Sequence, residues 1–359
     1  MGTSGTGYIP SLDGLRALAV GIVVLAHSNL EHVVPGGLGV TVFFFLSGYL
    51  ISTLLYREQR RHDRVDIKAF YLRRILRLSP PLWLALIAGY GLYAAGLVEG
   101  GFDPANLASQ LMYFSNYYNL YGPQPQWMVD GQFVLWSLAV EEHFYLLYPL
   151  FFIFLCRRPS TATRLAWMVG FLAASLAWRV FARQALGFDS RTLTFATDAR
   201  LDGILFGCLL ALMVEEGLAQ RLLPATRRAA VVAQGLGLVL LLFTLVYRDP
   251  LFRDTLRFTL QGLAMIPLFY YAVHMPELPW HRPLNWTSAR VLGLYSYSIY
   301  LIHHVAISAL ETSLGITDPP LLWAGGGALA VGYAALAYRW VEQPMAELRR
   351  RLHRNPALA

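Results

Sequence analysis

A fixed positive charge and a titratable imidazole interrupt the first apolar segment of the chain, residues 12–30. Arg16 and His27 are eleven residues apart, or about three helical turns, so both side chains leave one face of a helix about 16 Å apart along its axis. An ionisable group in a membrane span costs about 3 kcal/mol and usually marks function. We interpret His27 as a candidate general base and Arg16 as a candidate anion ligand. The alternative is a snorkelling arginine with a structural histidine.

A compact group of arginines precedes a proline pair in the segment FYLRRILRLSPP, residues 70–81. Arg74 and Arg77 are spaced i, i+3 and share a helix face, and Arg73 lies beside them. The planar guanidinium fork matches phosphate oxygens. We expect this group to bind an anionic cosubstrate immediately before a membrane span that begins at residue 80. The alternative is an ordinary basic flank of that span.

Two adjacent carboxylates enter an apolar run in the segment WSLAVEEHFYLLYP, residues 136–149. Ser137, Glu141 and Tyr145 follow the spacing i, i+4, i+8 and share one helix face. Glu142 is expected to face elsewhere. Carboxylates in a span need cationic partners, and none is near in the sequence, so we expect them from other helices. A carboxylate working with a histidine suits general acid–base chemistry on a hydroxyl, and Glu141 is the candidate.

Two later segments carry further polar residues. TDARLDGILFG, residues 197–207, holds two carboxylates that could pair with inward arginines, or that simply favour the dipole at a helix start. YSYSIYLIHH, residues 295–304, holds a histidine pair of which we expect one to face the bundle. The aromatic stretch 113–127 is explained by an interfacial belt or by stacking on a sugar. The candidates for contacting an acceptor or supporting the site are Asp13, Ser137, Glu142, Tyr145, Asp198, Arg200, Asp202, Tyr300 and His303.

The elements that must position these residues are apolar helices. The chain is 56% hydrophobic and 14% charged, with a mean hydropathy of +0.45, whereas a soluble domain carries about 25% charged residues. Its apolar runs lack the alternation of barrel strands. We predict an all-α integral membrane protein, a bundle of about ten transmembrane helices. The predicted spans are 14–31, 38–56, 80–99, 133–155, 165–182, 202–216, 229–247, 256–275, 290–311 and 321–341.

The placement of cations predicts the orientation. The 57–77 loop carries eight Arg or Lys residues and the 100–132 loop carries none, which puts both termini in the cytoplasm. Residues 1–345 would form the membrane domain and 346–359 a basic cytoplasmic tail. The predicted outer loops 179–200 and 248–257 contradict this pattern, with four and three Arg, unless those arginines point into a site.

The remaining composition narrows the chemistry. The net charge of +7 reflects loop asymmetry rather than nucleic-acid binding, and the two cysteines suggest neither a disulfide framework nor a metal site. There is no Gly-rich phosphate loop and no GxSxG elbow. His, Glu and Arg in an apolar bundle suit acyl transfer to a hydroxyl, with acyl-CoA as cosubstrate and no permanently bound cofactor. The phosphates of the acyl-CoA would contact Arg16 or the Arg73, Arg74 and Arg77 group.

The chain resembles the acyltransferase-3 family of integral membrane acyltransferases, which includes bacterial surface-polysaccharide O-acetyltransferases. The resemblance runs from Ile9 to about Met345 and rests on seven segments in order. They are IPSLDGLRALAV with Arg16 and His27, FFFLSGYLIS, FYLRRILRLSPP, WSLAVEEHFYLLYP, TDARLDGILFG, YSYSIYLIHH and the closing WVEQP.

The resemblance implies ten helices in the bacterial cytoplasmic membrane and acyl-CoA-dependent O-acylation of a sugar or envelope glycan. It implies that Arg16 and His27 form an essential pair, that Arg74 and Arg77 form the cytoplasmic arginine motif, and that Glu141 is the carboxylate of the fourth span. Some members carry an appended SGNH-type domain. We expect none here, because the chain ends about fifteen residues after WVEQP.

Three alternatives remain open at this stage. The acceptor could be a small molecule such as a macrolide instead of a glycan. The acyl group could pass directly to the acceptor or through an acyl-histidine. The protein could instead be a proton-coupled transporter or flippase of a lipid-linked sugar, with its deep His and Glu residues as proton sites.

Overall fold

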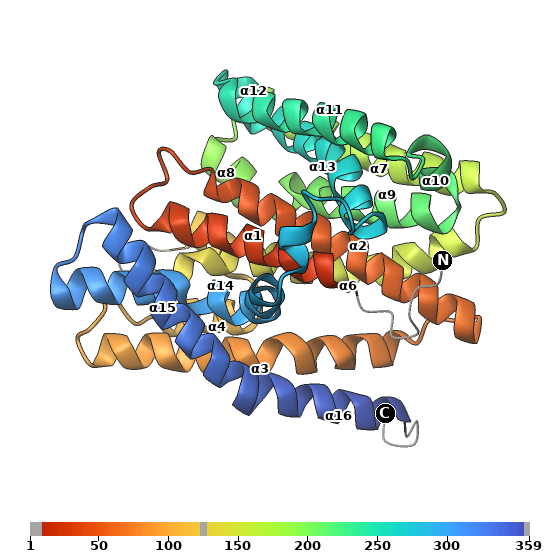
Figure 1. Ribbon diagram of the computed structural model, residues 1–359. Coiled ribbons are helices and arrows are strands. Elements are labelled where there is room, and N and C mark those ends of the chain that lie inside the picture. Colours follow the sequence, from red (N-terminus) through yellow and green to blue (C-terminus); the bar gives the residue numbers. More distant parts are fainter. Residues whose placement is uncertain (1–8, 123–127, 355–359) are drawn as a thin grey trace.

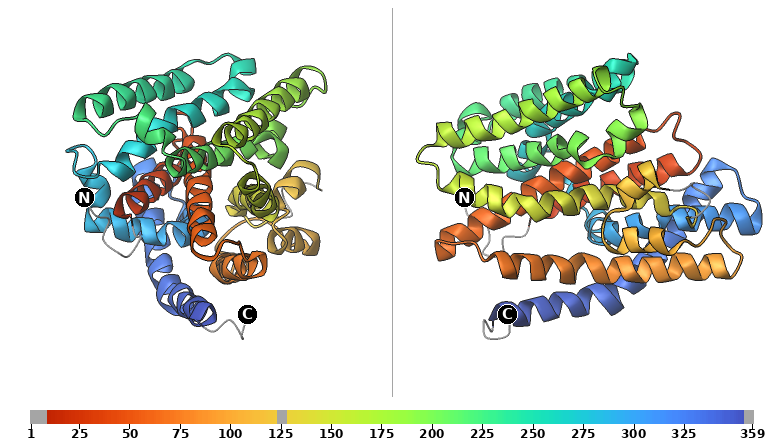
Figure 2. Two further views of the ribbon diagram at one scale, coloured as in Figure 1. Left: turned by 90° about the vertical axis from the view of Figure 1, so that its right-hand side faces the viewer. Right: turned by 180° about the vertical axis from the view of Figure 1, so that it is seen from behind.

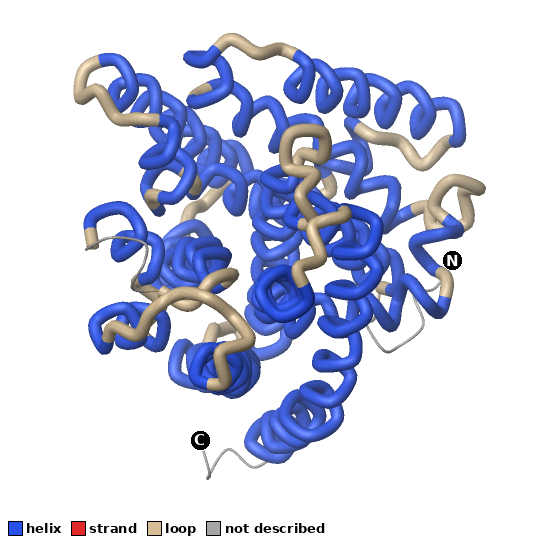
Figure 3. The backbone as a smooth tube through the Cα atoms, turned by 90° about the vertical axis from the view of Figure 1, so that its left-hand side faces the viewer, coloured by secondary structure: helices blue, strands red, loops and turns tan. Residues whose placement is uncertain are grey.

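The computed structural model describes residues 9–122 and 128–354, and in these ranges the chain forms helices without strands (Figures 1 and 3). The helical elements in chain order are α1 (Pro10–His27), α2 (Gly36–His62), α3 (Ile67–Ala94), α4 (Pro104–Leu111), α5 (Ser115–Tyr121), η2 (Gln132–Leu135), α6 (Trp136–Cys156), α7 (Thr161–Gln184), α8 (Ser190–Phe195), η3 (Thr197–Ala199), α9 (Leu201–Glu215), α10 (Leu218–Leu222), α11 (Arg227–Val246), α12 (Pro250–Asp254), α13 (Leu256–His274), η4 (Arg282–Asn285), α14 (Thr287–Leu314), α15 (Pro319–Ala337), η5 (Tyr338–Glu342) and α16 (Gln343–Arg354).

Within the described ranges, nine helical segments are long and apolar enough to cross a membrane. Their best windows have mean hydropathies from 1.2 to 2.4. The prediction of an all-α membrane bundle is confirmed. The predicted span 202–216 corresponds to α9, whose 15 residues are fewer than the roughly 20 that a hydrocarbon core requires.

Helix α9 lies inside the bundle, packed against α2, α13 and α7 (Figures 1 and 2). Eleven of its 15 residues are buried. Its approach to α2 depends on glycine, because a Cβ on Gly48 would lie 1.9 Å from the carbonyl oxygen of Ile204, and one on Gly207 would lie 2.0 Å from that of Phe45. Small residues permit such close packing of membrane helices. Protein, rather than lipid, therefore surrounds most of this short helix.

Helix α3 corrects one prediction. It begins at Ile67 and not near residue 80. The Asp66 carboxylate caps it by accepting a hydrogen bond from the amide of Ala69 at 2.9 Å. Pro80 and Pro81 lie within the helix, which is tolerated in membrane helices because neighbouring groups satisfy the freed carbonyls. The arginine motif is consequently part of a long helix rather than of a flanking loop.

The outer surface of the bundle is apolar, as expected for contact with lipid. Helix α11 shows this most clearly, since large aliphatic side chains project from most of its length. Those exposed on α11 are Val231, Val232, Leu236, Leu238, Val239, Leu242, Phe243 and Val246. A soluble monomer rarely exposes so large an apolar patch.

Helices α15 and α16 are continuous through the π-helical turn η5 and together form one long bent helix, called the rod below (Figure 1). The rod packs first against α14 and then beside α3. A π turn inserts an extra residue and re-aims the side chains that follow it. Residues 346–354, predicted as part of a separate tail, therefore belong to α16, which contacts α3; residues 355–359 of the predicted tail lie outside the described ranges.

Candidate functional site

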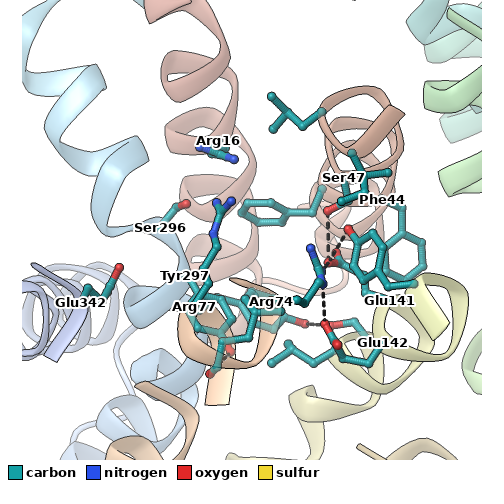
Figure 4. Close-up of a pocket in the computed structure, with 18 of the residues that line it drawn as sticks. Arg16, Phe44, Ser47, Arg74, Arg77, Glu141, Glu142, Ser296, Tyr297 and Glu342 are labelled. Atoms are coloured by element: carbon teal, nitrogen blue, oxygen red, sulfur yellow. Dashed lines mark hydrogen bonds and ion pairs between the residues drawn. The ribbon is translucent and has the colours of Figure 1, made fainter. Parts of the chain in front are cut away.

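A cavity of about 320 Å³ lies between α1, α2, α3, α6, α14 and the part of the rod that consists of η5 and α16 (Figure 4). Its walls combine apolar side chains with an unusual number of charges for a membrane bundle. The charged residues that line it are Arg16, Arg74, Arg77, Arg349, Glu141, Glu142 and Glu342.

One side of the cavity is built around Arg74 (Figure 4). Its Nε donates to Oε1 of Glu142 at 3.0 Å, and its Nη2 lies 3.9 Å from Oε2 of Glu141. The Ser47 hydroxyl donates to Glu141 at 3.1 Å, and the guanidinium carbon lies 3.1 Å from the ring centroid of Tyr145. The predicted partner from another helix is thus present, and it holds both carboxylates in place.

The prediction that Glu142 faces away from Glu141 is wrong. Both carboxylates line the cavity and both lie close to Arg74. Adjacent helical residues project about 100° apart, but a long guanidinium placed between them reaches both. His143, the next residue, does not line the cavity, and its Nδ1 lies 2.7 Å from the Thr197 hydroxyl.

The other side of the cavity holds Arg16 and Arg77, and Figure 4 shows the side chain of Arg77 extending toward Arg16. Arg16 is anchored by Asp13, whose carboxylate accepts from its Nη1 at 2.9 Å. Among the residues that the structure describes, Arg77 forms no ion pair within 4 Å. Arg73 lies outside the cavity and pairs with Glu58 at 2.7 Å. The arginine motif therefore supplies two cavity residues rather than three.

The polar end of the cavity nearest to the histidines is formed by Ser137 and Tyr300, whose hydroxyl oxygens are 2.7 Å apart. The Tyr300 hydroxyl also lies 3.0 Å from the carbonyl of Val134. Tyr113, from the predicted aromatic stretch, lines the cavity too, and burial raises its pKa to about 12 so that it stays neutral. Residues 123–127 of that stretch lie outside the described ranges.

His27 does not line the cavity but is linked to it through His303. Nδ1 of His27 lies 2.9 Å from Nε2 of His303, and Nδ1 of His303 lies 2.7 Å from the backbone carbonyl of Tyr300. His304 stacks on His27 with ring centroids 4.6 Å apart. We expected one of His303 and His304 to face the bundle, and in the structure both contact His27.

This chain of contacts determines the tautomers of the neutral rings. A carbonyl only accepts, so Nδ1 of His303 must carry its proton and Nε2 of His303 must accept. His27 then donates through its own Nδ1. The lone pair of Nε2 of His27 remains available, which is the form required of a general base.

A second cluster of buried charge lies outside the cavity. Nη2 of Arg179 donates to Asp202 at 2.8 Å, and both side chains are almost fully buried. Arg183 pairs with Asp254 at 2.9 Å, while the Arg200 guanidinium lies 3.9 Å above the ring of Phe258.

These contacts bear on two predictions, one about the arginines that contradict the charge rule and one about the partners of Asp198 and Asp202. The arginines of the 179–200 and 248–257 segments that contradict the charge rule include Arg179, Arg183 and Arg200, which point into the protein. Asp202 pairs with an inward arginine as expected. Asp198 does not, since it accepts from the side chains of Tyr117 and Trp178. None of these residues lines the cavity.

Sequence reasoning missed two charged cavity residues, Glu342 and Arg349, and the contact of His304. Glu342 lies in the WVEQP segment and accepts from the Ser298 hydroxyl at 2.6 Å. A carboxylate at the end of an apolar span is a usable signal. Arg349 gave none, because it is one of several basic residues near the end of the sequence.

The fold and the site together define a multi-pass membrane protein with a charged internal cavity, to which His303 and His27 are linked through Tyr300. The chain belongs to the acyltransferase-3 family, because the family described as an acyltransferase domain matches residues 9–339. This places the chain among acyltransferase enzymes and confirms the resemblance seen in its seven segments.

Similar proteins extend this result. The chain is 30% identical over 362 residues to the peptidoglycan O-acetyltransferase OatA of Listeria monocytogenes. It is 28% identical over 351 residues to the O-acetyltransferase OatA of Staphylococcus aureus. Each match covers 94% of this chain but only 56% and 57% of the relative, so the chain spans little more than half the length of these proteins. No solved structure matches the chain significantly.

Proposed function

We propose that the protein is a membrane O-acyltransferase that moves an acyl group, with acetyl the favoured one, from acyl-CoA to a hydroxyl of a cell-envelope glycan. The observation that carries the proposal is the continuous series of polar groups from Arg16 and Arg77, through Ser137 and Tyr300, to the His303 and His27 pair. The printed names of the relatives, peptidoglycan O-acetyltransferase among them, support a glycan acceptor.

The donor would enter the cavity from the cytoplasm. Arginine forks bind phosphate oxygens in pairs, and Arg16 and Arg77 line the same side of the cavity. The acyl end would extend toward Ser137 and Tyr300 at the other end. Under this proposal the protein resides in the bacterial cytoplasmic membrane with both termini in the cytoplasm, in accord with the basic segment 57–77, which spans the end of α2 and the start of α3.

His27 would act as the general base. As the acceptor oxygen bonds to the thioester carbonyl carbon, Nε2 of His27 takes the hydroxyl proton. The C–S bond then breaks, and the CoA thiolate recovers that proton from the imidazolium, so the ring returns to its starting state. Acylation of the same Nε2, followed by transfer to the hydroxyl, is the alternative route. Glu141 would orient the donor side of the site through Arg74.

The test uses purified full-length protein in nanodiscs with acetyl-CoA, longer acyl-CoAs and envelope glycan, and measures free CoA. His27→Ala should lower the rate of CoA release by about 10²- to 10⁴-fold. His32→Ala, an exposed histidine five residues away, is the matched control and should behave as wild type.

Other outcomes would replace the proposal. Near-normal release by folded His27→Ala protein would remove the catalytic role of His27. A transporter or flippase of a lipid-linked sugar would release no CoA with any donor. Release that requires a small hydroxylated molecule such as a macrolide, and that glycan does not support, would change the class of acceptor.

A further inference from the structure

The charges around the cavity are distributed unevenly between its two sides. Beside Arg74 are two carboxylates, Glu141 and Glu142, so that side carries an excess of negative charge. On the other side Arg16 has its own partner, Asp13. What remains there is two arginines, Arg77 and Arg349, facing the single carboxylate of Glu342.

Arg349 reaches the cavity because of the shape of the rod. After the π turn, the chain continues as α16, in which positions four and seven residues beyond Glu342 fall on the same face. These positions are Ala346 and Arg349, and both line the cavity with Glu342. Arg350 and Glu347 lie on the exposed face and are 3.9 Å apart. The amphipathic α16 therefore presents one arginine inward and another outward.

The surroundings of Arg349 are those of a ligand-binding group rather than of a completed ion pair. The Arg349 side chain is half-buried. Its Nε is buried, and no hydrogen-bond acceptor contacts it within the part of the chain that the structure describes. Glu342, which lines the cavity together with Arg349, accepts a hydrogen bond from the Ser298 hydroxyl. Arg16, Arg77 and Arg349 line the same cavity, and gathering like charges in one cavity is unfavourable unless an anion joins them.

We propose that Arg349 is the third arginine of a phosphate-binding subsite, with Arg16 and Arg77, that holds the nucleotide end of the acyl donor. Helix α16 thereby forms one wall of the donor site. The inference rests on the proposed function and extends it to a residue in the segment that sequence patterns assign to a basic tail. A phosphate on a lipid headgroup offers the same chemistry, so the experiment separates the two sources.

The experiment measures binding of two donors to full-length protein in nanodiscs of zwitterionic lipid. Acetyl-CoA carries phosphates, and S-acetylpantetheine carries the same thioester without them. Arg349→Ala should weaken acetyl-CoA binding by about 10- to 100-fold, as expected for losing a charged hydrogen bond, and should leave S-acetylpantetheine binding unchanged. Arg349→Lys keeps the charge but loses the fork, so its affinity for acetyl-CoA should lie between those of the wild type and of Arg349→Ala.

Arg350→Ala is the matched control. It removes the same charge from the neighbouring residue on the exposed face and should change acetyl-CoA affinity by less than about twofold. This comparison separates a bound phosphate from a general electrostatic effect of the helix.

Four results would overturn the inference. Unchanged acetyl-CoA affinity in Arg349→Ala would do so directly. Equal weakening of both donors would make Arg349 a packing residue of the cavity wall. Unchanged acetyl-CoA affinity, together with reduced retention of phosphatidylglycerol when that lipid is added to a second set of nanodiscs, would assign the subsite to a lipid headgroup. Failure of the wild-type protein to bind acetyl-CoA would refute the proposed function itself, which is a different result from a silent Arg349 substitution.

Discussion

At the scale of single residues, the histidine pair is the most constrained part of the site. His303 is fully buried between the carbonyl of Tyr300 and the ring of His27. It does not need to touch the substrates to matter, because it orients the base and determines which nitrogen of His27 is free. His303 is therefore a positioning residue in this mechanism, and His27 is the catalytic one.

His303→Ala should lower kcat by about 10- to 100-fold, less than His27→Ala, because His27 then loses its hydrogen-bond acceptor and its orientation. The affinity for acetyl-CoA should stay near that of wild type, since no arginine is altered. Steady-state kinetics and donor binding, measured on the same preparation, check both statements. A rise in KM with unchanged kcat would instead place His303 in the donor site.

Arg74 and Arg77 are three residues apart but should respond differently to substitution. Arg74→Ala leaves two partly buried carboxylates without their cation and should lower the free energy of unfolding by about 2 kcal/mol. Arg77→Ala removes a guanidinium that has no acidic partner within 4 Å among the described residues, so it should weaken acetyl-CoA binding with little loss of stability. Thermal unfolding in detergent and donor titration distinguish the two, and equal destabilisation would contradict this assignment.

At the scale of elements, the packing of α2 on α9 positions one wall of the cavity. Ser47 and Phe44 of α2 line the cavity, and Gly48 of α2 lies against the backbone of α9. The contact is between backbones, so it determines the position of α2 more tightly than contacts between flexible side chains would.

Gly48→Ala should therefore destabilise the protein and reduce activity together, because its methyl group would require α2 and α9 to separate. Gly235→Ala on α11 is the matched control, since a Cβ there meets nothing within 4 Å, and it should be neutral or stabilising by up to about 1 kcal/mol. Melting temperatures of the two variants test this. Similar melting temperatures would show that the contact between α2 and α9 accepts the added methyl group without loss of stability.

At the scale of the whole molecule, the proposed reaction requires that the cavity open to the cytoplasm and that His27 lie toward the outer side. Arg16, in the first half of α1, and His27, the last residue of α1, then mark the donor and acceptor ends of the site. The 57–77 and 100–132 segments fall on opposite sides of the membrane under this orientation.

Single cysteines test that orientation after Cys156 and Cys208 are replaced. A cysteine at Ala105 should react with a membrane-impermeant maleimide in intact cells, and one at Arg61 should react only after the membrane is permeabilised. Both positions are exposed, so labelling reports sidedness rather than burial. The reverse pattern would invert the topology and place the arginine cavity on the outer side.

Several features could be predicted from the sequence because they depend on local patterns. The length and apolarity of the segments specified a helical membrane bundle, and the spacing of Arg74 and Arg77 placed both in one cavity. The need of Glu141 for a cationic partner was also evident. The start of α3 was not, because a proline pair usually marks the first turn of a helix and is tolerated inside a membrane helix only when neighbours compensate.

The sequence by itself determined the class of protein and the residue types of its chemistry, because transferring charge into lipid is so unfavourable that every charged residue in a span is informative. Only the tertiary structure decided which charges meet. Glu142 joins Glu141 at Arg74, His303 orients His27, and Arg349 reaches the cavity from α16. These pairings join residues up to 276 positions apart, and helix packing, which no local periodicity encodes, brings them together.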